Sequence, residues 1–151
     1  MKLLFTFAFL FCFKESEGQK KLSVKQIDSV IHTEKNYRCI AGKNLLRIDS
    51  SVEPFKVLYC LDRSTKVLQM AKVFLNDKDT ALMQYKYFFI NDRIIKVEFL
   101  LKGSCNCFGE YYFNNDHLLY KKEKNIEVQN TEALLKTGYI LITNAKSQFK
   151  K

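Results

Sequence analysis

The chain has 151 residues and is strongly basic, with 25 lysine and arginine residues, 16 aspartate and glutamate residues and a formal net charge of +9. This length fits one domain whose core needs neither a metal nor several disulfides. The charge comes mainly from lysine, whereas proteins that read nucleic acid favour arginine for bidentate contacts. Composition therefore argues against nucleic-acid binding, while attraction to acidic polymers or membrane surfaces stays open.

The N-terminal segment has the pattern of a secretory signal peptide. Lys2 precedes the unbroken apolar run Leu3–Phe13, which is too short to cross a membrane and matches the apolar core of a signal peptide. A buried N-terminal strand or helix is one alternative. Lipid attachment at Cys12 is another, disfavoured because the bulky Phe11 precedes the cysteine.

A cleavage site is predicted at the end of this segment. Ser16 and Gly18 supply the small residues that a signal peptidase needs, with the cut before Gln19. We therefore expect residues 1–18 to be the signal peptide and residues 19–151 to form a single domain. The mature protein is expected to be secreted or periplasmic, where disulfides form readily.

The mature chain is predicted to begin with a helix. Ser23 and Gln26 have the spacing of a capping box. Apolar residues then recur at intervals of three and four, which marks one face of a helix, at Val24, Ile27 and Ile31. The helix is expected to end near Glu34.

From Phe55 onward the apolar residues follow a period of two, which is typical of strands. Six strand-like runs are separated by short Asn, Asp and Gly turns, at residues 55–61, 67–75, 82–90, 95–102, 105–113 and 118–123. No helical pattern intervenes, so consecutive antiparallel hairpins are predicted, since parallel crossovers need a dozen or more residues. One further short strand is suggested after Gly42, at Leu45, Leu46 and Ile48.

The C-terminal segment returns to a helical period. Asn130 or Thr131 can cap the helix, and one apolar stripe contains Leu134, Leu135, Gly138, Leu141, Ile142, Ala145 and Phe149. We expect this helix to pack on the sheet; a partner-binding or membrane-surface helix is the alternative. The predicted fold is therefore α+β, with an N-terminal helix, a curved antiparallel meander of about six strands and a C-terminal helix packed on the sheet.

The central sequence YKYFFINDRIIKVEFLLKGSCNCFGEYYFNNDHLLYKKEK resembles a pattern in small secreted proteins of Bacteroidota. In these proteins a strand ending in Tyr-Phe meets an Asn/Asp/Gly turn and then a Leu-Leu-Tyr or Leu-Ile-Tyr strand. The resemblance covers roughly residues 64–124 and implies an antiparallel meander with flanking helices in a secreted protein. Because these proteins have no established activity, the resemblance bears on fold and compartment and not on chemistry. The Cys-Asn-Cys stretch departs from the pattern.

The mature chain keeps four cysteines that can form disulfides, Cys39, Cys60, Cys105 and Cys107. Residues two apart on a strand lie about 6.6 Å apart, whereas a disulfide brings Cβ atoms to about 3.8 Å. We therefore expect Cys105 and Cys107 not to bond each other while extended. Pairing with Cys39 or Cys60, or burial as free thiols, stays open.

The sequence offers little that points to catalysis or metal binding. Its histidines are His32 and His117. A cluster of Cys105, Cys107 and His117 is conceivable, but zinc sites more often contain two pairs of ligands. Glu98 and Glu110 could meet on adjacent strands, and charged residues on an outward face explain them equally well. No nucleophile elbow, zinc-protease motif or phosphate-binding loop is present in the sequence, so we expect no enzyme, no cofactor and no metal.

Aromatic residues are the densest feature and form a possible binding face, at Tyr85, Tyr87, Phe89, Tyr112 and Tyr120. A partly covered aromatic sheet face is suited to binding. The leading hypothesis is a secreted or periplasmic, non-catalytic binding protein for an unknown protein or apolar ligand. An inhibitor or immunity protein that blocks a secreted enzyme through its sheet face is the first alternative, and an unrecognised enzyme is the second. No nucleic-acid partner is expected, and a membrane only if the chain is lipidated or associates with a surface.

Overall fold

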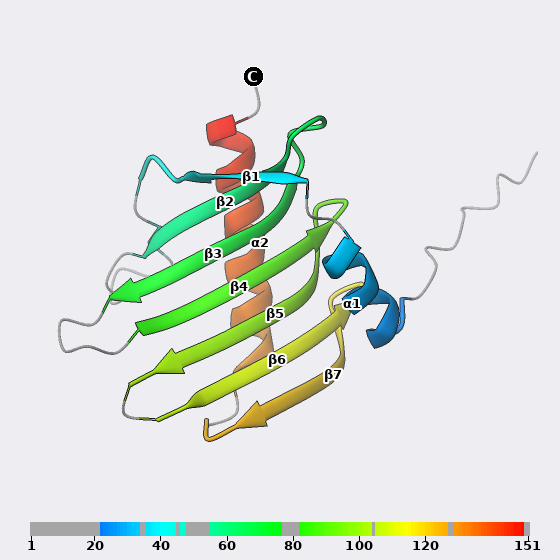
Figure 1. Cartoon of the computed structure of the whole chain (residues 1–151), viewed down its shortest axis with the longest axis vertical. Helices are drawn as coiled ribbons and strands as arrows, with labels where there is room; N and C mark the ends of the chain where they lie inside the picture. Colours follow the sequence, from blue (N-terminus) through cyan, green and yellow to red (C-terminus); the bar gives the residue numbers. More distant parts are fainter. Residues whose placement is uncertain are drawn as a thin grey trace, which may run out of the picture.

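The computed structural model describes residues 22–33, 36–44, 46–47, 55–76, 82–103, 105–126 and 129–149. These residues form an α+β fold in which seven antiparallel strands make one sheet in chain order (Figure 1). The elements are α1 (Val24–Thr33), β1 (Tyr37–Ala41), β2 (Lys56–Asp62), β3 (Leu68–Asn76), β4 (Leu82–Ile90), β5 (Arg93–Lys102), β6 (Cys107–Asn114), β7 (His117–Lys124) and α2 (Thr131–Phe149). The predicted fold class is confirmed.

Two tight turns explain how the meander follows directly from the sequence. Asn91-Asp92 joins β4 to β5, and Asn115-Asp116 joins β6 to β7, each with both residues in the left-handed region at φ between 49° and 64°. Two-residue hairpin loops favour this conformation because its twist matches that of the flanking strands. Asn and Asp tolerate it better than other residues with side chains, which is why these dipeptides punctuate the sheet.

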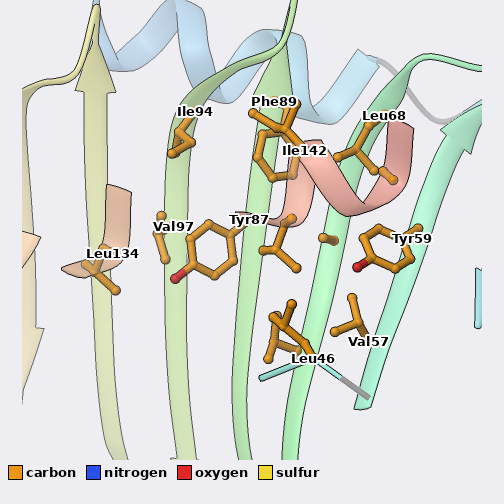
Figure 2. Close-up of a cluster of buried hydrophobic side chains, with 14 of the residues drawn as sticks. Leu46, Val57, Tyr59, Leu68, Tyr87, Phe89, Ile94, Val97, Leu134 and Ile142 are labelled. Atoms are coloured by element: carbon orange, nitrogen blue, oxygen red, sulfur yellow. The ribbon is translucent and has the colours of Figure 1, made fainter. Parts of the chain in front are cut away.

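Helix α2 crosses one face of the sheet and closes the main core (Figure 1). The side chain of Asn130 accepts hydrogen bonds from the backbone N–H groups of Glu132 and Ala133 and so caps the helix. Gly138 lets the helix approach β5 closely, because a Cβ atom there would lie 2.3 Å from Ile94 Cδ1. Figure 2 shows the packed side chains, with Leu134 and Ile142 of α2 among side chains from the strands.

Both predicted helices are confirmed, and α1 begins with the expected capping box. The Ser23 backbone N–H donates to Gln26 Oε1 at 2.8 Å, and the Gln26 N–H donates to Ser23 Oγ at 3.4 Å. Ile27 is the one residue of α1 that is fully buried. The signal peptide at residues 1–18 and its cleavage site lie outside the described residues, so both stay predictions.

The first strand differs from the prediction. β1 lies at Tyr37–Ala41, where the sequence pattern was weak, and Leu46 makes only an isolated bridge to Phe55. Leu45 and Ile48 are outside the described residues. β1 is an edge strand whose side chains are mostly exposed, so no alternation of buried and exposed residues marks it in the sequence.

Candidate functional site

The sheet has one face under α2 and an opposite face, which we call the outer face. Successive side chains of a strand point to opposite faces, so the strand register assigns whole rows of residues to the outer face. The charged row crosses β3 to β7 and consists of Lys72, Lys86, Glu98, Glu110 and Lys122. Beside it lies a second row, which we call the aromatic row after its two phenylalanines. It crosses β2 to β7 and consists of Lys56, Phe74, Gln84, Leu100, Phe108 and Lys124.

Helix α1 covers one end of the outer face. Ile27 packs against Ile95 and Tyr112, and all three are buried. Ile95 is an extra residue in the pairing of β4 with β5, which places Ile95 and Lys96 together beneath the helix. The apolar residues that contact this small second core include no member of the aromatic row.

Lys96 is the centre of a polar cluster under α1, which we call the Lys96 cluster. Its ammonium nitrogen Nζ lies 3.2 Å from Asp28 Oδ1, 3.1 Å from Glu98 Oε1 and 3.1 Å from Glu110 Oε1. The same nitrogen lies 4.7 Å from the centre of the Tyr112 ring. The Tyr112 hydroxyl donates to Asp28 Oδ1 at 3.0 Å. One ammonium group thus joins carboxylates from α1, β5 and β6.

The surroundings of Lys96 determine its protonation. Burial alone would lower the pKa of Lys96, because desolvation disfavours the charged form. Hydrogen bonds with Tyr112, Glu110 and Glu98 outweigh burial, and they raise the pKa of Lys96 above its ordinary value. Lys96 is therefore protonated at neutral pH and has no free electron pair for use as a nucleophile or base. Burial likewise raises the pKa of Tyr112, so its hydroxyl stays neutral.

The aromatic row lies beyond the part of the sheet that α1 covers. The charged row borders that part, because Glu98 and Glu110 also contact Lys96. Lys86 Nζ lies 3.6 Å from Glu98 Oε2, in a pair that is open to solvent. Leu100 and Phe108 are half-buried on adjacent strands, and Lys122 Nζ lies 5.7 Å from the centre of the Phe108 ring. This surface therefore has apolar side chains at its centre and charged groups around them.

The hollows on the described surface are small. Five of them have volumes of about 180 to 270 Å³, whereas pockets for small molecules usually measure about 300–1,000 Å³. One of about 180 Å³ lies over both rows between Gln84 and Glu110. These shapes suit the side chains of a macromolecular partner better than an enclosed apolar ligand.

The five aromatic residues of the predicted binding face do not share a face. Tyr87 and Phe89 are each 2% exposed in the core under α2, and Tyr85 is half-buried on the same side. Tyr112 lies under α1 on the outer face, and Tyr120 on β7 is 47% exposed. The prediction of one common face is wrong, because these residues fall on both alternating sets of side chains and helices cover four of them.

The structure contains two disulfides. Cys39 and Cys60 are direct partners in the register of β1 and β2 and are bonded to each other. Cys105 is bonded to Cys107, with their Cα atoms 5.3 Å apart. The expectation that these two would not bond each other is therefore wrong. Cys105 lies in a bend before β6 and only Cys107 belongs to the strand, so the extended geometry behind that expectation does not apply.

The conceivable Cys105, Cys107 and His117 cluster does not form. Cys107 begins β6 and His117 begins β7, at opposite ends of one hairpin. An eight-residue strand separates them by roughly 20 Å. Among the described residues no group of three or more His, Cys, Asp or Glu side chains is arranged to hold a metal ion. His32 is exposed on α1, and His117 is exposed at the turn.

Glu98 and Glu110 do meet on adjacent strands, in direct register. Sequence reasoning missed Lys96, which lies between them, and Asp28, which approaches from α1. The spacing of Lys96 and Glu98 on one strand already put both on the same face. No sequence signal indicated which residue of α1 would lie over that face.

Comparisons with known proteins give no relative. No family model matches the chain, and neither curated proteins nor solved structures show significant similarity. Neither of the two described helices is both long and apolar enough to span a bilayer. The two disulfides are consistent with an extracytoplasmic location.

Proposed function

We propose that this protein is a secreted or periplasmic, non-catalytic binding protein whose outer sheet face binds a protein partner. The observation that carries the proposal is the composition of that face. Leu100 and Phe108 form an apolar centre, with Gln84 and Lys124 on either side in the same row and Glu98 and Glu110 in the next row. An apolar centre inside a polar rim is the usual arrangement of a protein–protein interface.

The Lys96 cluster supports a non-catalytic role. It is the largest group of neighbouring ionisable side chains over the outer face that the described residues form, and its lysine is held protonated by Tyr112, Glu110 and Glu98. An ammonium group surrounded by carboxylates stabilises the position of α1 and offers no activated nucleophile. The apolar leader and the two disulfides support the proposed compartment, as does the resemblance to small secreted proteins of Bacteroidota.

The second candidate is an inhibitor or immunity protein, which is the same mode of binding directed at a secreted enzyme. The small volumes of the hollows favour it over storage of an apolar ligand. Inhibition of a co-purifying enzyme by the isolated protein would distinguish this candidate from a binding protein without inhibitory activity.

Co-purification with a matched control tests the proposal. Tagged mature protein, returned to its native source, is recovered from the envelope and the medium, and its partners are identified by mass spectrometry. Leu100→Ser with Phe108→Ser should lose the partner, whereas Val67→Ser should retain it. Val67 is a 41% exposed apolar residue near α2, away from the outer face. Equal recovery of partners by both variants, or none above an untagged background, would refute the proposal.

A further inference from the structure

The edge strand β7 is the least covered strand of the outer face. It has eight residues and is last in the sheet order, with β6 as its only strand partner among the described residues. Figure 1 shows β7 at the lower margin of the sheet. Alternate residues of an edge strand direct their N–H and C=O groups away from the sheet, so β7 presents a row of backbone groups to an additional strand.

The side chains of β7 make this edge basic. Lys121, Lys122 and Lys124 are exposed on it. Glu123, its one acidic residue, already accepts a hydrogen bond from the Tyr111 hydroxyl at 2.6 Å and pairs with Lys121 at 3.0 Å. Both contacts, led by that of Tyr111, lower the pKa of Glu123 and keep it ionised.

Two lysines on the outer face are available to a partner. Lys122 and Lys124 form no ion pair with any residue in the described part of the chain. Lys122 ends the charged row and Lys124 ends the aromatic row. Two residues before Lys122, Tyr120 is 47% exposed and lies against Tyr112 with ring centres 5.9 Å apart. The open end of the outer face is thus a line of Lys124, Lys122 and Tyr120.

A second copy of this chain is a poor occupant of the edge. Pairing β7 with another β7 would place two lysine-rich strands side by side, and like charges on neighbouring strands are destabilising. Lysine on an edge strand is a recognised protection against such self-association. The charge that excludes a second copy favours an acidic strand.

We propose that β7 binds an extended acidic segment of a partner protein as an eighth, antiparallel strand. The segment would carry an acidic residue opposite Lys124, a second acidic residue two positions later opposite Lys122, and an aromatic or large apolar residue two positions after that opposite Tyr120. Main-chain hydrogen bonds supply affinity in this mode of recognition, and alternate side chains supply specificity. This inference rests on the proposed function and names the chemical class of its partner.

Synthetic peptides of defined sequence test the proposal with the intact mature protein. Labelled TEVEVFT has the expected pattern, TKVKVFT reverses the charges, and TEPEPFT keeps the charges but loses two backbone N–H donors. Fluorescence anisotropy should show TEVEVFT binding about tenfold more tightly than either control. Backbone amide shifts measured by NMR should concentrate on β7. Equal binding of TEVEVFT and TEPEPFT would show that charge alone attracts the peptide and would overturn strand addition.

A charge exchange on the protein provides the second half of the test. The double variant Lys122→Glu with Lys124→Glu should bind TEVEVFT about tenfold more weakly than the parent protein, and it should bind TKVKVFT instead. The control Lys25→Glu with Lys136→Glu makes the same change in net charge on exposed helix positions and should leave TEVEVFT binding unchanged. Equal losses in both double variants would overturn the proposal.

The two proposals can fail separately. If the Leu100 and Phe108 variant loses a co-purifying partner while the Lys122 and Lys124 variant keeps it, the outer face binds but β7 is not its edge site. If TEVEVFT binds β7 as described and no partner depends on Leu100 and Phe108, strand addition stands and binding across the face fails.

Discussion

Replacing Lys96 by methionine tests whether the Lys96 cluster holds α1 on the sheet. The substitution keeps most of the side-chain length but removes the ammonium group that lies 3.1–3.2 Å from three carboxylates. The Lys96 side chain is 7% exposed, while those of Asp28, Glu98 and Glu110 are 37%, 28% and 22% exposed. The substitution therefore removes a positive charge from a position that is almost free of solvent, while the three carboxylates that remain are partly hydrated.

The structure gives a magnitude for this change. Removing one partner from a buried ion pair costs about 3–5 kcal/mol, because the remaining charge is uncompensated. Partial hydration of the carboxylates puts Lys96→Met near the lower end, at about 3 kcal/mol. Lys86→Met is the matched control. Its ammonium group lies 3.6 Å from Glu98 Oε2 and its side chain is 37% exposed, so loss of this charge should cost less than about 1 kcal/mol.

The pH dependence gives an independent prediction. The pKa of Lys96 is raised in the folded state. Its contribution to the free energy of unfolding is therefore fully present below about pH 10.4, and it declines only as pH rises through the folded-state pKa. Between pH 6 and pH 9 the parent protein should therefore lose no stability through deprotonation of Lys96. The stability deficit of Lys96→Met relative to the parent should therefore stay constant across this range.

Urea unfolding followed by far-UV circular dichroism measures both effects. Hydrogen exchange of the α1 amides should report faster opening in Lys96→Met than in Lys86→Met. Equal free energies of unfolding for the two variants at pH 7 would show that solvent screens the Lys96 cluster and that apolar packing of Ile27 alone holds the helix.

Two further predictions follow from the fold and one from the sequence. Gly138→Ala should lower the free energy of unfolding by about 1–3 kcal/mol in urea titrations, because the new Cβ would lie 2.3 Å from Ile94 Cδ1; a gain in stability, as helix propensity alone predicts, would contradict the close approach. Alkylation of the exported, denatured protein should modify none of the cysteines before reduction, and Cys39→Ser with Cys60→Ser should cost about 3 kcal/mol for the loop of sequence separation 21; free thiols in the exported protein would contradict the pairing. Intact mass of the exported protein should give Gln19 as its first residue, and a full-length product would refute the predicted leader.

The sequence predicted most of the scaffold because local signals determine it. The Asn91-Asp92 and Asn115-Asp116 pairs favour left-handed turns, and a period of two between them requires strands. The Ser23–Gln26 capping box and the Asn130 cap begin the two helices where the sequence indicates. These features involve residues within a few positions of each other, so they are visible without tertiary structure.

Only the tertiary structure decided which surface is left uncovered as the candidate site. Alternation separates Tyr87 from Tyr112 by face in principle, but it does not tell which face α2 covers or where α1 lies. Asp28 reaches Lys96 across 68 positions of sequence, a contact that depends on the position of α1 over the sheet. The bond between Cys105 and Cys107 is local, but it forms because Cys105 lies in a bend before β6 and not in an extended strand. The sequence by itself thus determined the elements and their order, whereas the packing of two helices on opposite faces decided which residues became core and which became the candidate site, because burial depends on contacts between distant segments.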